Sequence, residues 1–359
     1  METNFPSESL GPPSPGASLP AAPPPTLRDR SGGLVAFGVI QIVLGGLAAL
    51  AIPFMLLSAL LSRKTTGAAM PAGSYMASML TWAVVAVAFV ILGIGSIRAR
   101  RWAWALTLIL SWIWLLMGVL VTILLTAVLP TAFLAGFRKA AEANPAATGA
   151  AMPTGIMAAV LTFVIVFFAV LFIAVPLAFL LFYRRKDVEE TCKRRDPVER
   201  WTDRCPLPVL AASLLFACAS PYYLLMSITT PLLPFFGKYL TGVPGGLGCV
   251  VLAGIDAYLA FSLFRLKATG WWIAVAALML RVVSAAITFR HADLFQAYAK
   301  LGWQSQQLEI MSQNPAVTAG LWWGLGFTVL FFGYLLWIKR YFSRPPVRNG
   351  MVSLASPGP

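Results

Sequence analysis

The amino-acid sequence predicts an all-α integral membrane bundle with eight transmembrane helices, and three observations support this prediction. Of 359 residues, 59% are hydrophobic and 11% are charged, whereas a soluble domain carries about 25% charged residues. The mean hydropathy is +0.79. Apolar runs long enough to cross a hydrocarbon core of about 30 Å recur along the whole chain. Together these observations exclude a soluble globular fold.

Eight apolar segments are expected to span the membrane. They lie near residues 34–61, 75–97, 102–129, 155–183, 206–228, 244–264, 270–289 and 319–338. Pro53, Pro176 and Pro221 fall inside these segments, where a proline can kink the helix. Kinked helices occur in transporters, but they also occur in membrane proteins without transport activity, so the prolines do not select a function.

The remaining segments divide the chain into units. Residues 1–31 contain eight prolines and few large apolar residues, which predicts a disordered cytoplasmic tail without the features of a signal peptide. Residues 32–186 and 205–342 each contain four predicted spans. A charged cytoplasmic loop, residues 187–204, lies between them, and residues 343–359 are expected to form a second disordered tail.

The densest charged stretch of the chain runs from Arg184 to Arg204 and contains eight Lys and Arg residues. Because so many charges cannot lie in hydrocarbon, the stretch is expected at the membrane surface, in contact with anionic lipid. The basic residues assigned to this contact are Arg184, Arg185, Lys186, Lys193, Arg194 and Arg195. No nucleic-acid-binding motif accompanies them, so we expect no nucleic-acid partner despite the net charge of +14.

The distribution of Lys and Arg predicts the orientation of the chain. Both tails and the loops after the second, fourth and sixth spans hold 19 of the 27 basic residues, and the opposite side holds 7. Because cytoplasmic loops are enriched in Lys and Arg, both termini and the central loop are expected in the cytoplasm. The predicted location is the inner, or plasma, membrane of a bacterium.

Landmarks in the two halves suggest an internal repeat. Residues 98–104 contain basic residues followed by tryptophans, as do residues 265–272; Asn-Pro pairs precede the fourth and eighth spans, at 144–145 and 314–315. The offsets are 167 (265 − 98) and 170 (314 − 144). Because each half has an even number of spans, the sequence predicts two parallel four-span repeats related by an axis along the membrane normal.

Two segments on the predicted outer side carry an apolar stripe at helical spacing. They are residues 133–141, before the first Asn-Pro pair, and residues 294–308, before the second. Each is interpreted as a short amphipathic helix. It either lies along the membrane interface or covers the mouth of the bundle, and periodicity does not distinguish these alternatives.

The sequence contains no recognisable catalytic constellation. His291 is the single histidine, and no Gly-x-Ser-x-Gly or phosphate-binding glycine loop is present. Cys192 and Cys205 flank the charged loop without further metal ligands and are expected to be reduced thiols. We therefore expect no enzymatic activity, no metal and no cofactor. The glycines at 245–248 and 320–324 are interpreted as sites of close helix packing.

Asp256 and Arg281 are ionisable residues inside predicted spans. They lie about 14 and 16 Å from the same end of two consecutive antiparallel helices, at ~1.5 Å per residue, which places both near the middle of the membrane. We expect them to pair, because an isolated charge there is costly. The pair either belongs to a proton or solute path or fixes helix docking. The first half carries Phe89 and Trp112 at the aligned positions.

The segment Asp196-Pro197-x-x-Arg200-Trp201-x-Asp203-Arg204-Cys205-Pro206-Leu207-Pro208 resembles a loop of uncharacterised bacterial multi-pass membrane proteins. This resemblance implies a membrane protein and brings no activity with it. The favoured function is a non-enzymatic membrane scaffold or accessory protein, with a membrane-protein partner or a homo-oligomer as possible assemblies. The alternative is a small-solute or proton-coupled transporter that uses the region of Asp256 and Arg281.

Overall fold

The computed structural model describes residues 29–66, 72–143, 154–313 and 315–342. Eight helices in these residues are long and apolar enough to cross a membrane: Ser31–Leu61, Tyr75–Ile97, Arg101–Pro130, Ala158–Tyr183, Leu207–Thr229, Gly242–Phe264, Ala268–His291 and Ala319–Tyr341. Each predicted span has a counterpart among them, so the chain is a multi-pass helical membrane protein. Of the two predicted tails, residues 1–28 and 343–359 lie outside the described residues.

The first half of the bundle is built from four spans. Its elements are α1 (Ser31–Thr66), α2 (Ala72–Ile97), α3 (Arg101–Ala143), α4 (Thr154–Ala169), the π-helical turn η2 (Val170–Ala174) and α5 (Val175–Tyr183), of which the last three form one span. Helices α1 and α2 pack most closely at two glycines. A Cβ atom on Gly93 would lie 2.6 Å from the carbonyl oxygen of Gly38, so these glycines let the two backbones approach.

The π-helical turn in the fourth span has an identifiable cause. Pro176 has no N–H to bond the carbonyl of Phe172, four residues earlier, so the α-helical hydrogen-bond ladder is interrupted at this turn. On the neighbouring helix α3, a Cβ atom on Gly118 would collide with the carbonyl oxygen of Phe172. The absence of a side chain at Gly118 therefore makes room for the irregular backbone.

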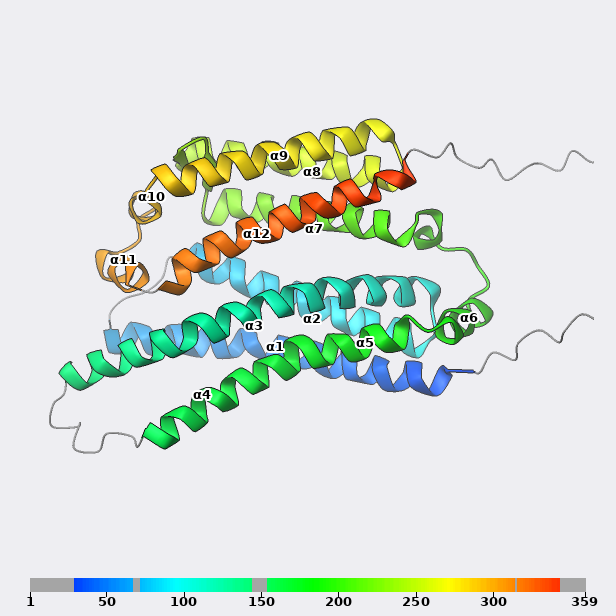
Figure 1. Cartoon of the computed structure of the whole chain (residues 1–359), viewed down its shortest axis with the longest axis horizontal. Coiled ribbons are helices and arrows are strands. Elements are labelled where there is room, and N and C mark those ends of the chain that lie inside the picture. Colours follow the sequence, from blue (N-terminus) through cyan, green and yellow to red (C-terminus); the bar gives the residue numbers. More distant parts are fainter. Residues whose placement is uncertain (1–28, 67–71, 144–153, 314, 343–359) are drawn as a thin grey trace, which may run out of the picture.

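A charged linker joins the halves and leads into the second bundle. The elements in order are α6 (Lys186–Arg195), η3 (Trp201–Arg204), α7 (Leu207–Thr229), β1 (Leu232–Phe235), β2 (Lys238–Thr241), α8 (Gly242–Phe264), α9 (Ala268–His291), α10 (Leu294–Lys300), α11 (Ser305–Ser312), α12 (Pro315–Trp337) and η4 (Ile338–Tyr341). The linker end of the bundle is the end at which α6 and η3 lie, and the hairpin end is the opposite one. Figure 1 shows both described chain ends on the linker side.

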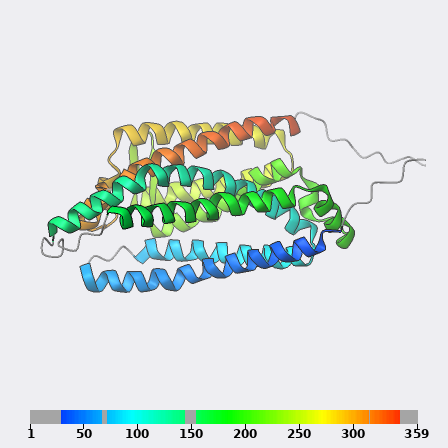
Figure 2. The same cartoon turned by 60° about the horizontal axis from the view of Figure 1, so that its bottom comes forward.

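The two halves lie side by side and meet unequally. Helix α2 packs against α7 and α3 packs against α12, while the corresponding pairs, α8 with α1 and α9 with α5, make no comparable contact among the described helices. Figure 2 shows α1 and α2 as a separate layer below the other spans. A two-fold axis along the membrane normal would make the two sets of contacts equal. The contact between the halves is therefore not two-fold symmetric.

The turns that join α2 to α3 and α8 to α9 have the same backbone geometry. Ala99 and Leu266 both adopt left-handed conformations, with φ of 49° and 55°. The N–H of the following residue donates to the carbonyl five residues earlier in each turn, at 2.9 Å for Arg100 and 3.0 Å for Lys267. This hydrogen bond is the one that closes a Schellman motif at a helix C-terminus.

A tryptophan in the helix after each turn ties that helix to the last span of its own half. The indole N–H of Trp104 donates to the carbonyl of Tyr183 at 2.9 Å, and that of Trp271 donates to the carbonyl of Leu335 at 2.8 Å. Both acceptors lie close to the linker end, where the last span of each half finishes. Each half is thus closed by the same kind of contact.

The structure corrects the interpretation of the segment at residues 133–141. Helix α3 continues through Pro130 to Ala143, so this segment prolongs a span and does not form a separate interfacial helix. In the second half, short helices do form, and α10 packs against β2. Of the two alternatives left open for residues 294–308, the structure favours a cap over the bundle for α10.

The β1–β2 hairpin was not predicted from the sequence. The strands pair antiparallel with Phe235 opposite Lys238, which leaves a two-residue turn at Phe236 and Gly237. Both turn residues have positive φ, 39° and 89°, as a turn that matches the twist of a hairpin requires. A short apolar run bounded by Pro and Gly is hard to distinguish from the end of a membrane span by hydropathy alone.

Candidate functional site

The structure brings Asp256 and Arg281 together in the second half. One terminal guanidinium nitrogen of Arg281 donates to Asp256 Oδ1 at 2.6 Å and the other donates to Oδ2 at 3.2 Å. The Asp256 side chain is fully buried, and that of Arg281 is 20% exposed. A bidentate pair of this kind has no net charge, and it offsets the cost of placing both ions among apolar helices.

Surrounding groups hold the guanidinium of Arg281. Its central carbon lies 5.6 Å from the ring centre of Tyr223 on α7, within range of a cation–π contact. Its Nε atom is buried without a hydrogen-bond partner. The pair therefore connects α8 to α9 directly and α9 to α7 through the tyrosine ring.

An aromatic pair in the first half involves Phe89, one of the residues aligned with the ion pair from the sequence. The rings of Phe89 and Trp114 meet edge to face, with centres 5.4 Å apart. Both residues lie 167 positions before the ionic partners, at 256 − 89 and 281 − 114. From the sequence, Trp112 and not Trp114 was aligned with Arg281.

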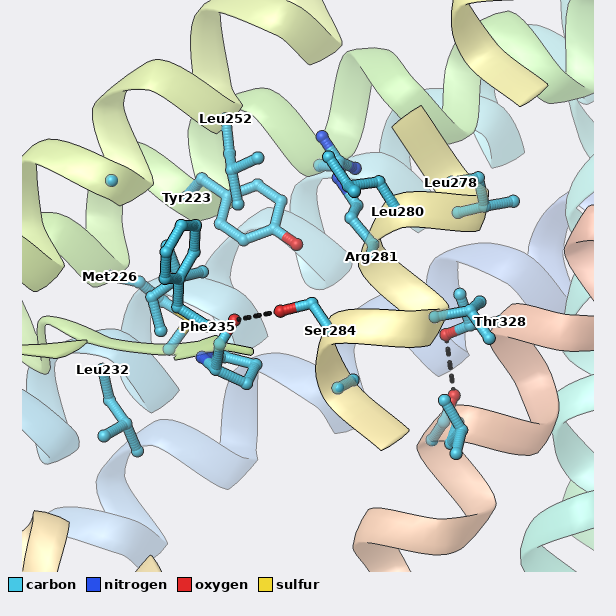
Figure 3. A pocket seen from close by; sticks show the side chains of 18 of the residues that line it. Tyr223, Met226, Leu232, Phe235, Leu252, Leu278, Leu280, Arg281, Ser284 and Thr328 are labelled. Carbon is cyan, nitrogen blue, oxygen red and sulfur yellow. Dashed lines mark hydrogen bonds between the residues drawn. The ribbon is translucent and has the colours of Figure 1, made fainter. Parts of the chain in front are cut away.

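A cavity of about 990 Å³ lies beside Arg281, between α7, α8, α9, α12 and the hairpin. Figure 3 shows Arg281, Tyr223 and Ser284 around it, with Thr328 of α12 to one side. Arg281 is the one charged residue among the described residues that line it, and most of the others are Leu, Phe, Val or Ala. The cavity is thus an apolar chamber with one guanidinium at its wall.

The hairpin covers the cavity and is fastened to α9. The backbone N–H of Phe236 donates to Ser284 Oγ at 3.0 Å, and Ser284 in turn donates to the carbonyl of Pro234 at 3.1 Å. One helical turn further, the N–H of Gly237 donates to Thr288 Oγ1 at 3.0 Å. The two hydroxyl groups therefore satisfy backbone groups at the tip of the hairpin that no strand pairs.

The two glycine clusters have different roles. A Cβ atom on Gly245 would lie 2.5 Å from the Pro231 carbonyl oxygen, so this glycine packs closely against the start of the hairpin, in line with the packing interpretation. Gly320 and Gly324 have nothing within 4 Å of such an atom and line the cavity. The close-packing interpretation is therefore wrong for Gly320 and Gly324.

The charged linker folds back onto the linker end of the first half. Helix α6 buries Val188, Thr191 and Cys192, and its apolar contacts include Leu34 and Tyr183. The six basic residues assigned to lipid lie around this helix. Arg184, Arg185, Lys186, Arg194 and Arg195 are exposed, whereas Lys193 is half-buried and pairs with Glu189 at 2.7 Å.

Asp196 is the centre of a further ionic network. Its side chain is 2% exposed and accepts hydrogen bonds from two nitrogens of Arg200, at 2.8 and 3.1 Å. Arg100, from the turn between α2 and α3, lies 3.6 Å away. Hydrogen bonding from Arg200, together with the Arg101 backbone N–H and the nearby positive charges, holds the pKa of the Asp196 carboxyl below its usual range. The linker is thus clamped to the loop between the second and third spans.

The linker cysteines lie in apolar surroundings. Burial raises the pKa of both Cys192 and Cys205 to about 12, so both thiols are protonated at neutral pH. Among the described residues there is no group of three His, Cys, Asp or Glu side chains that could hold a metal ion. No family model, curated protein or solved structure matches the chain.

Proposed function

We propose that this chain is a non-enzymatic accessory protein of the cytoplasmic membrane that holds an apolar, lipid-like ligand inside its second four-helix half. The observation that carries the proposal is the 990 Å³ cavity, which lies among membrane-spanning helices and has a mainly apolar lining. Cavities that bind small molecules fall in the range of about 300–1,000 Å³ and are lined predominantly by hydrophobic side chains. A lipid-like molecule from the surrounding bilayer is the ligand that fits this cavity.

The pairing of Arg281 with Asp256 limits which ligands the cavity can bind. Both terminal nitrogens of the guanidinium are engaged by Asp256, so the cavity wall has little net charge to attract an anion. Ser284 and Thr328 add hydroxyl groups, and both already donate to backbone carbonyls. A weakly polar lipid or isoprenoid-like molecule is therefore a better match than a charged metabolite.

The same geometry argues against a proton-coupled transporter. A proton carrier needs a carboxylate that exchanges protons with water. Asp256 has no exposed surface, and both of its oxygens accept hydrogen bonds from Arg281. A rigid neutral pair of this kind fits a structural role in docking α8 onto α9.

Filling the cavity provides the test. Gly324→Phe places a ring in open space inside the chamber, whereas Gly326→Phe, two residues along the same helix, places one outside it. Native mass spectrometry of the purified proteins is expected to detect a retained lipid-like molecule in the wild type and in Gly326→Phe, and to find it largely lost from Gly324→Phe. Equal occupancy in both variants, or none in the wild type, overturns the proposal.

The transporter alternative has its own measurement. Proteoliposomes with a pH-sensitive dye inside are expected to show no proton flux above that of empty liposomes. A flux that disappears in Asp256→Asn, with the bound molecule unchanged, would favour the transporter.

We also propose that both termini and the linker face the cytoplasm of a bacterial cell. The positive-inside distribution supports this orientation. The test uses a chain without native cysteines and two exposed positions, Arg194→Cys at the linker end and Gln304→Cys at the hairpin end. An impermeant thiol reagent is expected to label position 304 and not position 194 in intact cells; the reverse pattern would invert the topology.

We further propose that the two halves are parallel copies of one four-span unit. The shared turns at Ala99 and Leu266 and the shared indole contacts of Trp104 and Trp271 support a common origin. On this proposal, the unequal contacts between the halves arose when the two copies packed against each other after duplication.

A further inference from the structure

A second, smaller pocket lies at the linker end, outside the apolar cavity. It has a volume of about 350 Å³ and lies beside the turn between α2 and α3. Three arginines line it, Arg98 and Arg100 from the turn and Arg200 from the linker, opposite an apolar wall formed by Ile91, Ile94 and Trp102. Three arginines beside exposed apolar side chains form an unusual surface, because charged side chains favour water and apolar side chains favour hydrocarbon.

The pocket keeps excess positive charge after its internal pairing. Arg200 and Arg100 share the carboxylate of Asp196, and Asp203 lies 3.5 Å from Arg101. Four guanidinium groups thus face two carboxylates. Arg98 is exposed and makes no ion pair with the described residues. An anion entering the pocket would find Arg98 free, together with the outer edges of Arg100 and Arg200.

The apolar wall of the pocket is exposed on the outside of the bundle. Ile91 and Ile94 are 50% and 40% exposed, and their spacing of three residues puts them on the same face of α2, in its last two turns. Exposed apolar side chains on a membrane-spanning helix are suited to contact with hydrocarbon. Trp102 lies at the start of the next span, as expected for an aromatic residue at the membrane interface.

We infer that this pocket binds the phosphate group of an anionic glycerophospholipid, with the acyl chains lying along Ile91 and Ile94. Guanidinium groups form bidentate, charge-assisted hydrogen bonds with phosphate oxygens. A lipid places its phosphate at the interface and its chains in hydrocarbon, which is the arrangement of the arginines and isoleucines. A soluble phosphate would use the arginines and leave the isoleucines without a role. The binding residues therefore differ from the six expected around α6.

The second half provides an internal control. In its matching turn, Arg265 stacks on the ring of Phe261, with 4.2 Å between the guanidinium carbon and the ring centre. The turn also carries Lys267, so two basic residues are present there as well. The same number of charges can therefore be removed from either turn.

The experiment measures lipid binding to the full-length protein in detergent by native mass spectrometry, with phosphatidylglycerol and phosphatidylcholine as probes. Wild-type protein is expected to prefer phosphatidylglycerol. The double variant Arg98→Gln/Arg100→Gln should lose this preference by about tenfold, because each basic residue near an anionic surface contributes appreciably to binding. The control Arg265→Gln/Lys267→Gln should keep it. Equal losses in both variants, or no preference in the wild type, overturn the inference.

Two further measurements identify the source of the phosphate. Ile94→Gln leaves the arginines intact and is expected to weaken binding of phosphatidylglycerol. Inorganic phosphate in large excess is expected not to displace the lipid. Displacement by inorganic phosphate, or an unchanged affinity in Ile94→Gln, would show that the pocket recognises a free anion, and the inference of a lipid would fail. Unchanged thermal unfolding of each variant confirms that binding, and not folding, has been altered.

Discussion

Gly95 and Ala103 pack so closely that a Cβ atom on Gly95 would lie 2.6 Å from the Cβ of Ala103. In the second half the arrangement is inverted. Ser262 and Gly270 lie 167 residues after Gly95 and Ala103, and a Cβ atom on Gly270 would lie 2.6 Å from the Cβ of Ser262. Each turn thus has room for one side chain between its two helices. In the first half this side chain belongs to Ala103, after the turn, and in the second half to Ser262, before the turn.

This relationship makes a prediction about the repeat. Gly95→Ser should destabilise the protein by about 1–3 kcal/mol, the usual range for overpacking. Adding Ala103→Gly, which recreates the Ser–Gly pair of the second half, should restore much of the loss. The measurement is thermal unfolding in detergent. Gly46→Ser is the control, because a Cβ atom there has nothing within 4 Å. A double variant no more stable than Gly95→Ser would show that the two turns are not equivalent.

The second prediction concerns the intramembrane ion pair. Asp256→Asn or Arg281→Gln alone leaves one charge without its partner among apolar helices, and each should cost about 3–5 kcal/mol. The double variant should be more stable than either single variant, because no lone charge remains. Folded yield and unfolding temperature in detergent measure the effect. If the double variant is no better than the worse single one, the two side chains are not coupled.

The third prediction follows from the depressed pKa of Asp196. A carboxyl whose pKa is lower in the folded state stabilises the protein above the ordinary carboxyl pKa of about 3.9, and this contribution disappears as the pH falls through the folded value. The unfolding temperature should therefore fall more steeply below pH 5 in the wild type than in Asp196→Asn. Glu199→Gln, at an exposed neighbouring position, should follow the wild-type profile. Identical profiles for the wild type and Asp196→Asn would contradict the network around Asp196.

The fourth prediction concerns the linker thiols. With pKa values of about 12, Cys192 and Cys205 present roughly one thiolate in 10⁴ molecules at pH 8, so maleimide should react slowly in the folded protein and readily after denaturation. A cysteine at the exposed position Val198 should react fast in a background without native cysteines. Rapid labelling of Cys192 in folded protein would mean that α6 does not stay packed on the first half.

Much of the architecture follows from local composition. Long apolar runs need helices in a bilayer, so all eight spans could be located from hydropathy. The meeting of Asp256 and Arg281 was foreseeable as well, because a short turn between antiparallel helices places residues at equal distances from it side by side.

The sequence by itself determined that this chain is a helical membrane protein, approximately where its spans lie, and which two intramembrane charges meet. Only the tertiary structure showed the cavity behind the hairpin and the pocket between Arg98 and Arg200. It also showed which distant residues meet in the ionic network around Asp196. The physical reason is that hydropathy is a property of single residues and turns. A cavity or a shared carboxylate depends on how far helices from different parts of the chain stand apart, and that distance is set by packing.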